Sequence, residues 1–211
     1  MDFNNMLNFV NDILKENNAI KPHKPNQCFR NRYEHSVRVL KWAKRLADDY
    51  SDIDYDVLYT ACIFHDVGYA YGKDDHATNS VKIFKEYAEL FKLDSKFVKK
   101  VSDIIIVHSD KSLLKNPFSS HELIIMLEAD LMDEEGALGI VWDLFSKGMD
   151  NPDSFDDSIK TLYKHSAHIL DQDYMITPTA KKIWNEKKEL VRDFILQLKE
   201  DLFLEGDVSN E

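Results

Sequence analysis

Glycine, proline and cysteine are scarce in this sequence, and long apolar runs are missing. The 211 residues include six glycines, five prolines and two cysteines. So few turn-forming residues disfavour a sheet built on tight hairpins, whereas the abundance of Leu, Lys, Glu and Ala favours helices. No apolar stretch reaches the roughly 18–20 residues that a bilayer span needs, so we expect no membrane segment.

Charge and cysteine usage narrow the class of protein further. Cys28 and Cys62 lie far apart, in no spacing typical of a disulfide framework or a metal site. We therefore expect a cytoplasmic protein, and the first twenty residues do not resemble a secretory signal. A net charge of −11 should repel nucleic acid polymers. A small phosphorylated substrate remains compatible, because a bound divalent cation would dominate the local field.

The hydrophobic periodicity predicts a single all-α domain over residues 1–211, with a core at about 30–147 and closing helices at about 158–204. The N-terminal helix has an apolar face that could pack on the body or on a second subunit of a homodimer. Asp54 and Thr177 are expected to cap helices, as is a Ser119–Glu122 capping box. The predicted helices are 2–16, 31–50, 54–65, 76–91, 95–108, 121–133, 136–147, 158–170 and 178–204.

Breaks are expected between these helices wherever proline, glycine or polar runs occur. Pro22 and Pro25 interrupt the chain at 21–29, and Gly68 and Gly72 are predicted to end the third helix. Residues 150–157 are predicted to form a loop, and residues 206–211 a frayed tail.

Polar residues recur on the apolar faces of these helices. His35, His65, His108 and Asp130 each share a face with aliphatic side chains, and Asp66 follows His65 directly in Ala-Cys-Ile-Phe-His-Asp-Val-Gly. Burying a carboxylate without a partner is costly. A divalent ion shared by His35, His65, Asp66 and Asp130 would satisfy all four, since imidazole and carboxylate suit Mn, Fe, Zn or Mg. A buried His–Asp hydrogen-bond network without metal is the alternative.

The ordered set of a His, a His-Asp pair and a distant Asp resembles the HD-domain superfamily of metal-dependent phosphohydrolases. The Tyr-Glu-His-Ser-Val-Arg-Val-Leu context of His35 is similar too. A subgroup of compact bacterial HD enzymes places its last ligand in Asp-Ala-Asp-Arg-Leu-Asp-x-x-Gly-Ala-x-Gly. Residues 128–139 read Glu-Ala-Asp-Leu-Met-Asp-Glu-Glu-Gly-Ala-Leu-Gly. The resemblance runs from about residue 30 to 203 and implies a compact helical HD-domain bundle.

The resemblance also implies roles for particular residues. His35, His65, Asp66 and Asp130 would hold a divalent ion (Mn, Fe, Mg, Co or Zn), with manganese among the expected metals. Asp66, His76 and His108 are the catalytic candidates. The two extra histidines resemble positions that hold a second ion in two-metal relatives, where the Asp of the pair bridges; in the other reading they orient the ligands of one ion or face the phosphate.

One departure from the subgroup concerns phosphate recognition. The subgroup has arginine where this chain has Leu131, so other cations must contact a substrate phosphate if that arginine does so in relatives. The candidates near the ligands are Arg32, Arg38, Lys73 and Lys111.

The expected activity is hydrolysis of a small phosphorylated metabolite, a nucleotide first of all, by metal-activated water. Two other classes remain open. One is a di-iron oxygenase or lyase on the same scaffold, and the other is a non-catalytic module that binds metal or nucleotide.

Overall fold

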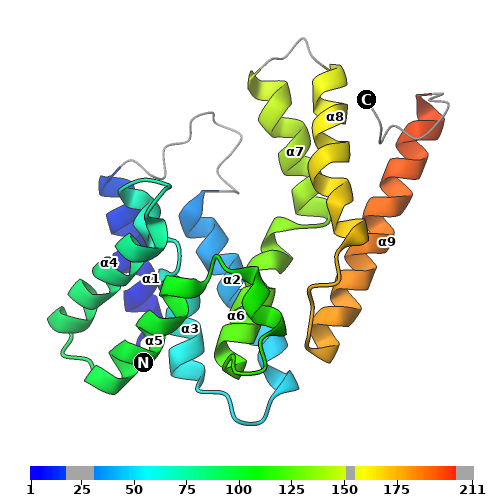
Figure 1. Ribbon diagram of the computed structural model, residues 1–211. Helices are drawn as coiled ribbons and strands as arrows, with labels where there is room; N and C mark the ends of the chain where they lie inside the picture. The colour runs from blue at the N-terminus through cyan, green and yellow to red at the C-terminus, as the bar shows by residue number, and fades with distance from the viewer. Residues whose placement is uncertain (18–30, 151–154, 203–211) are drawn as a thin grey trace. The chain divides into compact units, whose positions relative to one another are not determined.

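A computed structural model describes residues 1–17, 31–150 and 155–202 (Figure 1). Every regular element in these ranges is helical, which confirms the all-α prediction. The chain divides into two compact units, Met1–Asp130 and Leu131–Glu211, and the boundary falls inside α6 (His121–Glu134). No helix in the described ranges is long and apolar enough to cross a bilayer.

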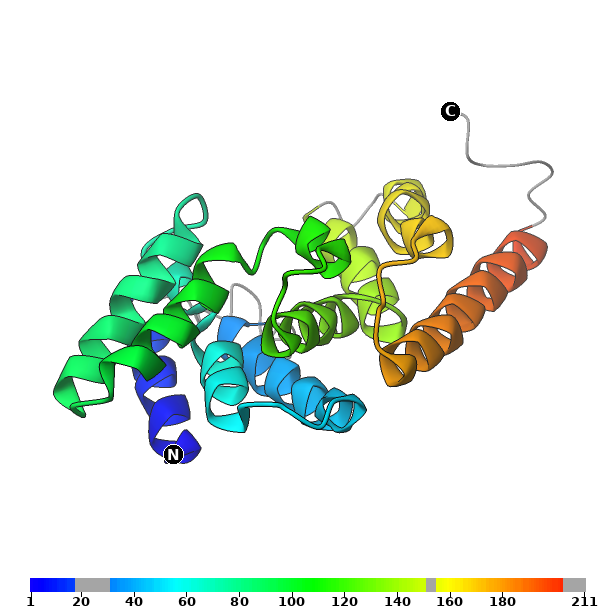
Figure 2. The same ribbon diagram turned by 60° about the horizontal axis from the view of Figure 1, so that its bottom comes forward.

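The first unit is organised around α3 (Tyr55–Phe64), whose core-facing residues are fully buried. Helices α1 (Phe3–Glu16), α2 (Arg32–Leu46) and α5 (Ser95–Val107) all pack against it. Helix α4 (His76–Leu90) lies beside α5 in both views (Figures 1 and 2). The described residues of this unit also include three 3-10 turns: η2 (Ala47–Asp49), η3 (Val67–Ala70) and η4 (Lys111–Lys115). The helix predicted at 31–50 therefore ends as η2.

The apolar face of α1 is used within the chain. Met6, Val10 and Leu14 are buried, and the helix packs against α3 and η3. Of the two expected uses of this face, packing on the body is the one the structure shows. A homodimer remains a prediction.

The start of α6 differs from the predicted capping box. The cap is Ser120, whose Oγ accepts a hydrogen bond from the Leu123 N–H at 3.2 Å, and not Ser119. Glu122 does not reach back to its own helix, because its Oε1 accepts from the Asp54 N–H at 2.9 Å. Asp54 caps α3 as expected, through the Val57 N–H. The predicted capping-box residue Glu122 therefore forms a hydrogen bond between the starts of α3 and α6 instead.

Gly68 does not terminate α3, which already ends at Phe64. It lies buried in η3, and its N–H donates to the Ser80 Oγ at 2.8 Å. A Cβ at Gly68 would lie 2.0 Å from the His76 carbonyl oxygen and 2.5 Å from the Ser80 nitrogen. Only glycine allows η3 to approach the first turn of α4 this closely.

The second unit contains the closing helices. α7 (Ala137–Asp150) packs on α8 (Phe155–His165), and α9 (Pro178–Asp201) packs on α7 and on the 3-10 turn η5 (Ser166–Asp171). Thr177 caps α9 as predicted, with Pro178 in its first turn. The indole of Trp184 is buried and donates to the Gln172 carbonyl at 2.9 Å, which holds the segment before α9.

Two predictions about loops need correction or lie outside the described residues. The loop predicted at 150–157 is too long, because α7 extends to Asp150 and α8 begins at Phe155. The predicted break at 21–29, with Cys28, and the tail from Gly206 lie outside the described residues, as do 151–154.

We predict that Gly68→Ala lowers the free energy of unfolding by roughly 3 kcal/mol or more, because its methyl group meets backbone atoms that cannot rotate away. Ser80→Ala should cost about 1–3 kcal/mol by leaving the buried Gly68 N–H without its acceptor. Urea unfolding of the chelator-treated protein measures both. Thr78→Ala, exposed on the same turn of α4, is the matched control; an equal loss there would contradict the close-approach explanation.

Candidate metal centre

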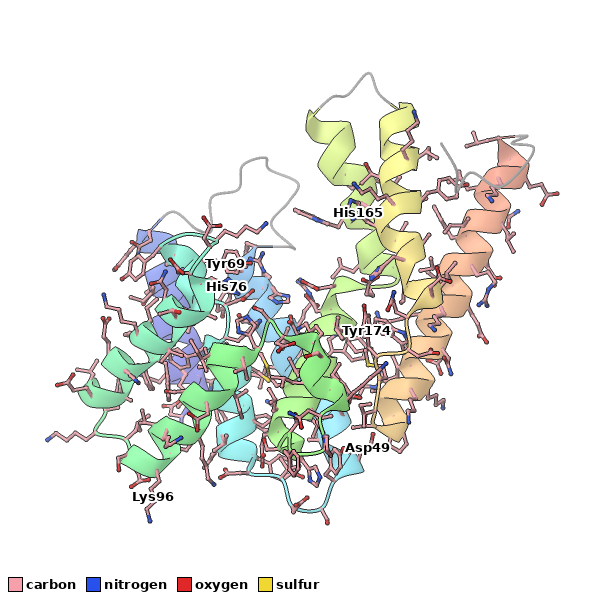
Figure 3. All side chains as sticks on the ribbon, in the orientation of Figure 1. Asp49, Tyr69, His76, Lys96, His165 and Tyr174 are labelled. Carbon is pink, nitrogen blue, oxygen red and sulfur yellow. The ribbon has the colours of Figure 1, made fainter. Side chains whose placement is uncertain are left out.

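Six His and Asp side chains from five different helices meet in the first unit. Most of them lie at or beside a helix end, and Figure 3 labels His76 at the start of α4. All but His76 are buried, and His76 is half-buried. The burial of these polar groups on apolar helix faces agrees with the sequence pattern. They are His35 on α2, His65 and Asp66 after α3, His76 on α4, His108 after α5 and Asp130 on α6.

Four of these residues form a first cluster. The His35 Nε2 atom lies 3.2 Å from the His65 Nε2 and 3.1 Å from the Asp130 Oδ1. The Asp66 Oδ2 lies 3.6 Å from the His35 Nε2 and 3.7 Å from the His65 Nε2. The four residues are those that the sequence singled out for one ion.

A second cluster uses the other oxygen of the same carboxylate. The Asp66 Oδ1 lies 3.3 Å from the His108 Nε2 and 3.7 Å from the His76 Nε2, and those two nitrogens are 3.1 Å apart. Two sets of three donor atoms converge at spacings that can hold a metal ion: His35, His65 and Asp66 in the first cluster, and Asp66, His76 and His108 in the second. Asp66 therefore belongs to both clusters, one oxygen to each.

The histidine tautomers are set by backbone carbonyls. In His65, His76 and His108 the Nδ1 atom lies 2.7–2.9 Å from the carbonyl oxygen three residues earlier. A carbonyl can only accept, so each Nδ1 carries the hydrogen and each neutral ring presents its Nε2 lone pair to the cluster.

This protonation leaves lone pairs facing each other. The His76 and His108 Nε2 atoms, 3.1 Å apart, cannot hydrogen-bond to one another as neutral rings. The Ser109 Oγ lies 3.3 Å and 3.4 Å from them and can donate its one hydrogen to only one of the two. A neutral His–Asp network therefore leaves this cluster unsatisfied, whereas a cation satisfies it. The donor set, imidazole nitrogen plus carboxylate oxygen, fits a transition-metal ion.

Two cations are held against the two carboxylates. The Arg32 Nη1 donates to the Asp66 Oδ2 at 2.6 Å, and Lys111 donates to the Asp130 Oδ2 and to the His108 carbonyl. Although burial opposes the charged form, the positive charge of Arg32 beside the carboxylate holds the pKa of Asp66 below its ordinary value. Lys111 and His35 do the same for Asp130. Both carboxylates are thus ionised.

Burial acts in the opposite direction on His65. This ring is completely buried, and desolvation of its charged form lowers its pKa to about 4, against the attraction of Asp66 and Asp130. His65 is therefore neutral at physiological pH, which is the form that ligates a metal.

The other two predicted phosphate contacts, Lys73 and Arg38, lie in different surroundings. Lys73 enters the site through its carbonyl, which accepts from His76, while its side chain is exposed. Arg38 is half-buried one turn beyond His35 on α2, and its contact with phosphate stays a prediction. His121, the first residue of α6, is partly exposed and stacks on Tyr50, away from both clusters.

Two residues at the site were missed from sequence. Ser109 directly follows His108, and Tyr69 follows Asp66 by three positions; the ring of Tyr69 contacts both Arg32 and His76. Their only sequence signal is closeness to the ligands.

Because His65 is neutral when folded, the stability of the chelator-treated, metal-free protein should fall in acid. The folded pKa of His65 lies below the unfolded value of about 6.5, so the unfolded chain takes up the proton first as pH falls. We predict that a stability contribution of roughly 3 kcal/mol is complete above pH 6.5 and is lost as pH falls toward 4. Two-bond ¹H–¹⁵N spectra, assigned with His65→Gln, should show the Nδ1–H tautomer down to about pH 5. A midpoint near 6.5 would contradict the burial argument.

Comparisons with known proteins agree with this geometry. Residues 32–135 match the model of the HD domain family, a range that contains all six residues of the two clusters. No curated protein sequence matches the chain.

Solved bacterial structures share the fold over nearly the whole length. An HD-superfamily hydrolase from Bacillus thuringiensis has a TM-score of 0.69 at 20% identity, covering 96% of this chain and 97% of that one. Lin1889 from Listeria innocua gives 0.64 at 23%, covering 98% and 100%. Bacillus subtilis YpgQ, solved in complex with ADP, gives 0.63 at 20%, covering 93% and 96%. This chain therefore carries an HD domain at residues 32–135, the domain of metal-dependent hydrolases.

Proposed function

We propose that this protein is a phosphohydrolase that holds two divalent ions and acts on a small phosphorylated metabolite, a nucleotide first of all. The observation that carries the proposal is the sharing of Asp66. Its two oxygens face two separate His-containing clusters, and the second cluster presents two facing Nε2 lone pairs that a cation would satisfy. A buried site of this kind serves chemistry on a charged substrate better than it serves stability.

The six residues of the two clusters would hold two separate ions. His35, His65 and Asp130 would hold one ion with the Asp66 Oδ2, and His76 and His108 would hold the other with the Asp66 Oδ1. Divalent ions held there would polarise a phosphoryl oxygen and make bound water acidic. The carbonyls of Cys62, Lys73 and Ile105 keep three of the imidazoles in the ligating tautomer.

A negatively charged substrate is supported by the local charge. The whole chain carries −11, but Lys111 and Arg32 lie beside the two carboxylates and offset them. Lys73 and Arg38 are the further candidate phosphate contacts. The ADP bound to the Bacillus subtilis YpgQ fold makes nucleotides the first substrates to test.

The first experiment measures release of phosphate and pyrophosphate from a panel of nucleotides with Mn, Mg, Co or Fe added. Metal-dependent release supports the proposal and identifies the bond cleaved. Activity that strictly needs Fe and O₂ would favour the oxygenase alternative. Bound metal with no turnover in any condition would favour the binding module.

We predict that His65→Ala and Asp130→Ala abolish retention of the ion in the first cluster and reduce turnover by roughly 100-fold or more, because each removes a buried ligand. Elemental analysis after gel filtration measures retention, and circular dichroism checks that the helices persist. His165→Ala, an exposed histidine on α8, is the matched control. Full retention of metal by either site variant would defeat the ligand assignment.

A second pair of variants separates two ions from one. His76→Ala and His108→Ala should lower the bound metal from about two ions per chain to about one, since they remove ligands of the second cluster only. If the wild type binds a single ion and these variants keep it, His76 and His108 orient or face the substrate instead.

A further inference from the structure

The aromatic ring of Tyr69 connects two groups that reach the shared carboxylate. The Arg32 guanidinium lies over this ring, 3.7 Å from its centroid, and the His76 imidazole lies 4.5 Å away, tilted by 32°. Figure 3 labels Tyr69 and His76 side by side. Arg32 comes from the first turn of α2 and His76 from the first residue of α4, so one ring joins two segments far apart in sequence.

Arg32 and His76, which contact the Tyr69 ring, both approach the Asp66 carboxylate, each at a different oxygen. Arg32 donates to the Oδ2, which faces the first cluster, and the His76 Nε2 approaches the Oδ1, which faces the second. The backbone completes the arrangement, because the Tyr69 N–H donates to the Asp66 carbonyl at 3.1 Å. Tyr69 therefore contacts Asp66 through its backbone. Through its ring it contacts Arg32 and His76, which lie on either side of the Asp66 carboxylate.

The turn that carries Tyr69 is itself fixed. It belongs to η3, which the Gly68–Ser80 hydrogen bond holds against α4. Tyr69 is half-buried, and the Arg32 and His76 contacts occupy its ring. A substrate base would have to displace one of them to stack there, so the ring is better suited to support than to recognition.

We infer that Tyr69 is a positioning residue that sets the second cation site, by holding His76 toward Asp66 while Arg32 fixes the carboxylate from the other side. The inference rests on the proposed function, since it concerns the metal affinity of the same centre. It also assigns Arg32, which stacks on the Tyr69 ring, to the Asp66 carboxylate and not to a substrate phosphate.

The test uses Co²⁺ alone, with binding followed by calorimetry and by the visible spectrum of the bound ion. Tyr69→Met keeps most of the volume without a flat ring. It should weaken binding of the second ion by about 10–100-fold and change its spectrum, with the first ion unaffected. Tyr69→Phe keeps the ring and should bind like the wild type. Tyr71→Leu, two residues along and exposed, is the matched control.

The outcomes separate this inference from the function on which it rests. A wild type that binds no Co²⁺ defeats the proposed function itself. A wild type that binds two ions, with Tyr69→Met binding both equally well, overturns only the role of Tyr69. Equal loss of both ions in Tyr69→Met and Tyr69→Phe, or loss of the fold in both, also overturns it, because the ring would then matter to structure alone.

Discussion

The hydrogen bond from an imidazole Nδ1 to the carbonyl three residues earlier determines the character of the whole site. It occurs at His65, His76 and His108, and in a neutral ring it commits the only hydrogen to the backbone. Each Nε2 must then face the interior as a lone pair. Two ionised carboxylates lie among these rings, so the centre gathers many acceptors, and the cationic side chains of Arg32 and Lys111 contact it.

Two of these bonds also solve a problem of helix termination. The last carbonyls of a helix have no intrahelical partner. His65 and His108 follow the ends of α3 and α5, and their rings donate to Cys62 and Ile105 in the respective last turns. At the end of α3 the same contact satisfies a buried carbonyl and orients the His65 ring. At the end of α5 it adds to the hydrogen bond that the His108 N–H already donates to the Ile105 carbonyl at 3.4 Å.

Four residues of the two clusters could be singled out from sequence, because each is a polar residue on an otherwise apolar helix face: His35, His65, His108 and Asp130. Asp66 and His76 came from the resemblance to HD domains. The supporting contacts could not be predicted from sequence. Glu122 fits a capping box, yet its carboxylate bonds to Asp54, 68 positions earlier. Tyr69 is an ordinary aromatic residue until α2 and α4 bring Arg32 and His76 to its ring. Such contacts depend on how distant segments pack, which no local pattern encodes.

Gly68 has a consequence for how this protein can change over time. A side chain at that position would press first on the backbone oxygen of His76, the residue that begins α4 and completes the second cluster. The gap between Gly68 in η3 and the backbone of His76 is thus too small for one additional carbon atom. A side chain at position 68 is open to the chain only together with a compensating retreat of α4, so Gly68 and the start of α4 can vary only as a pair.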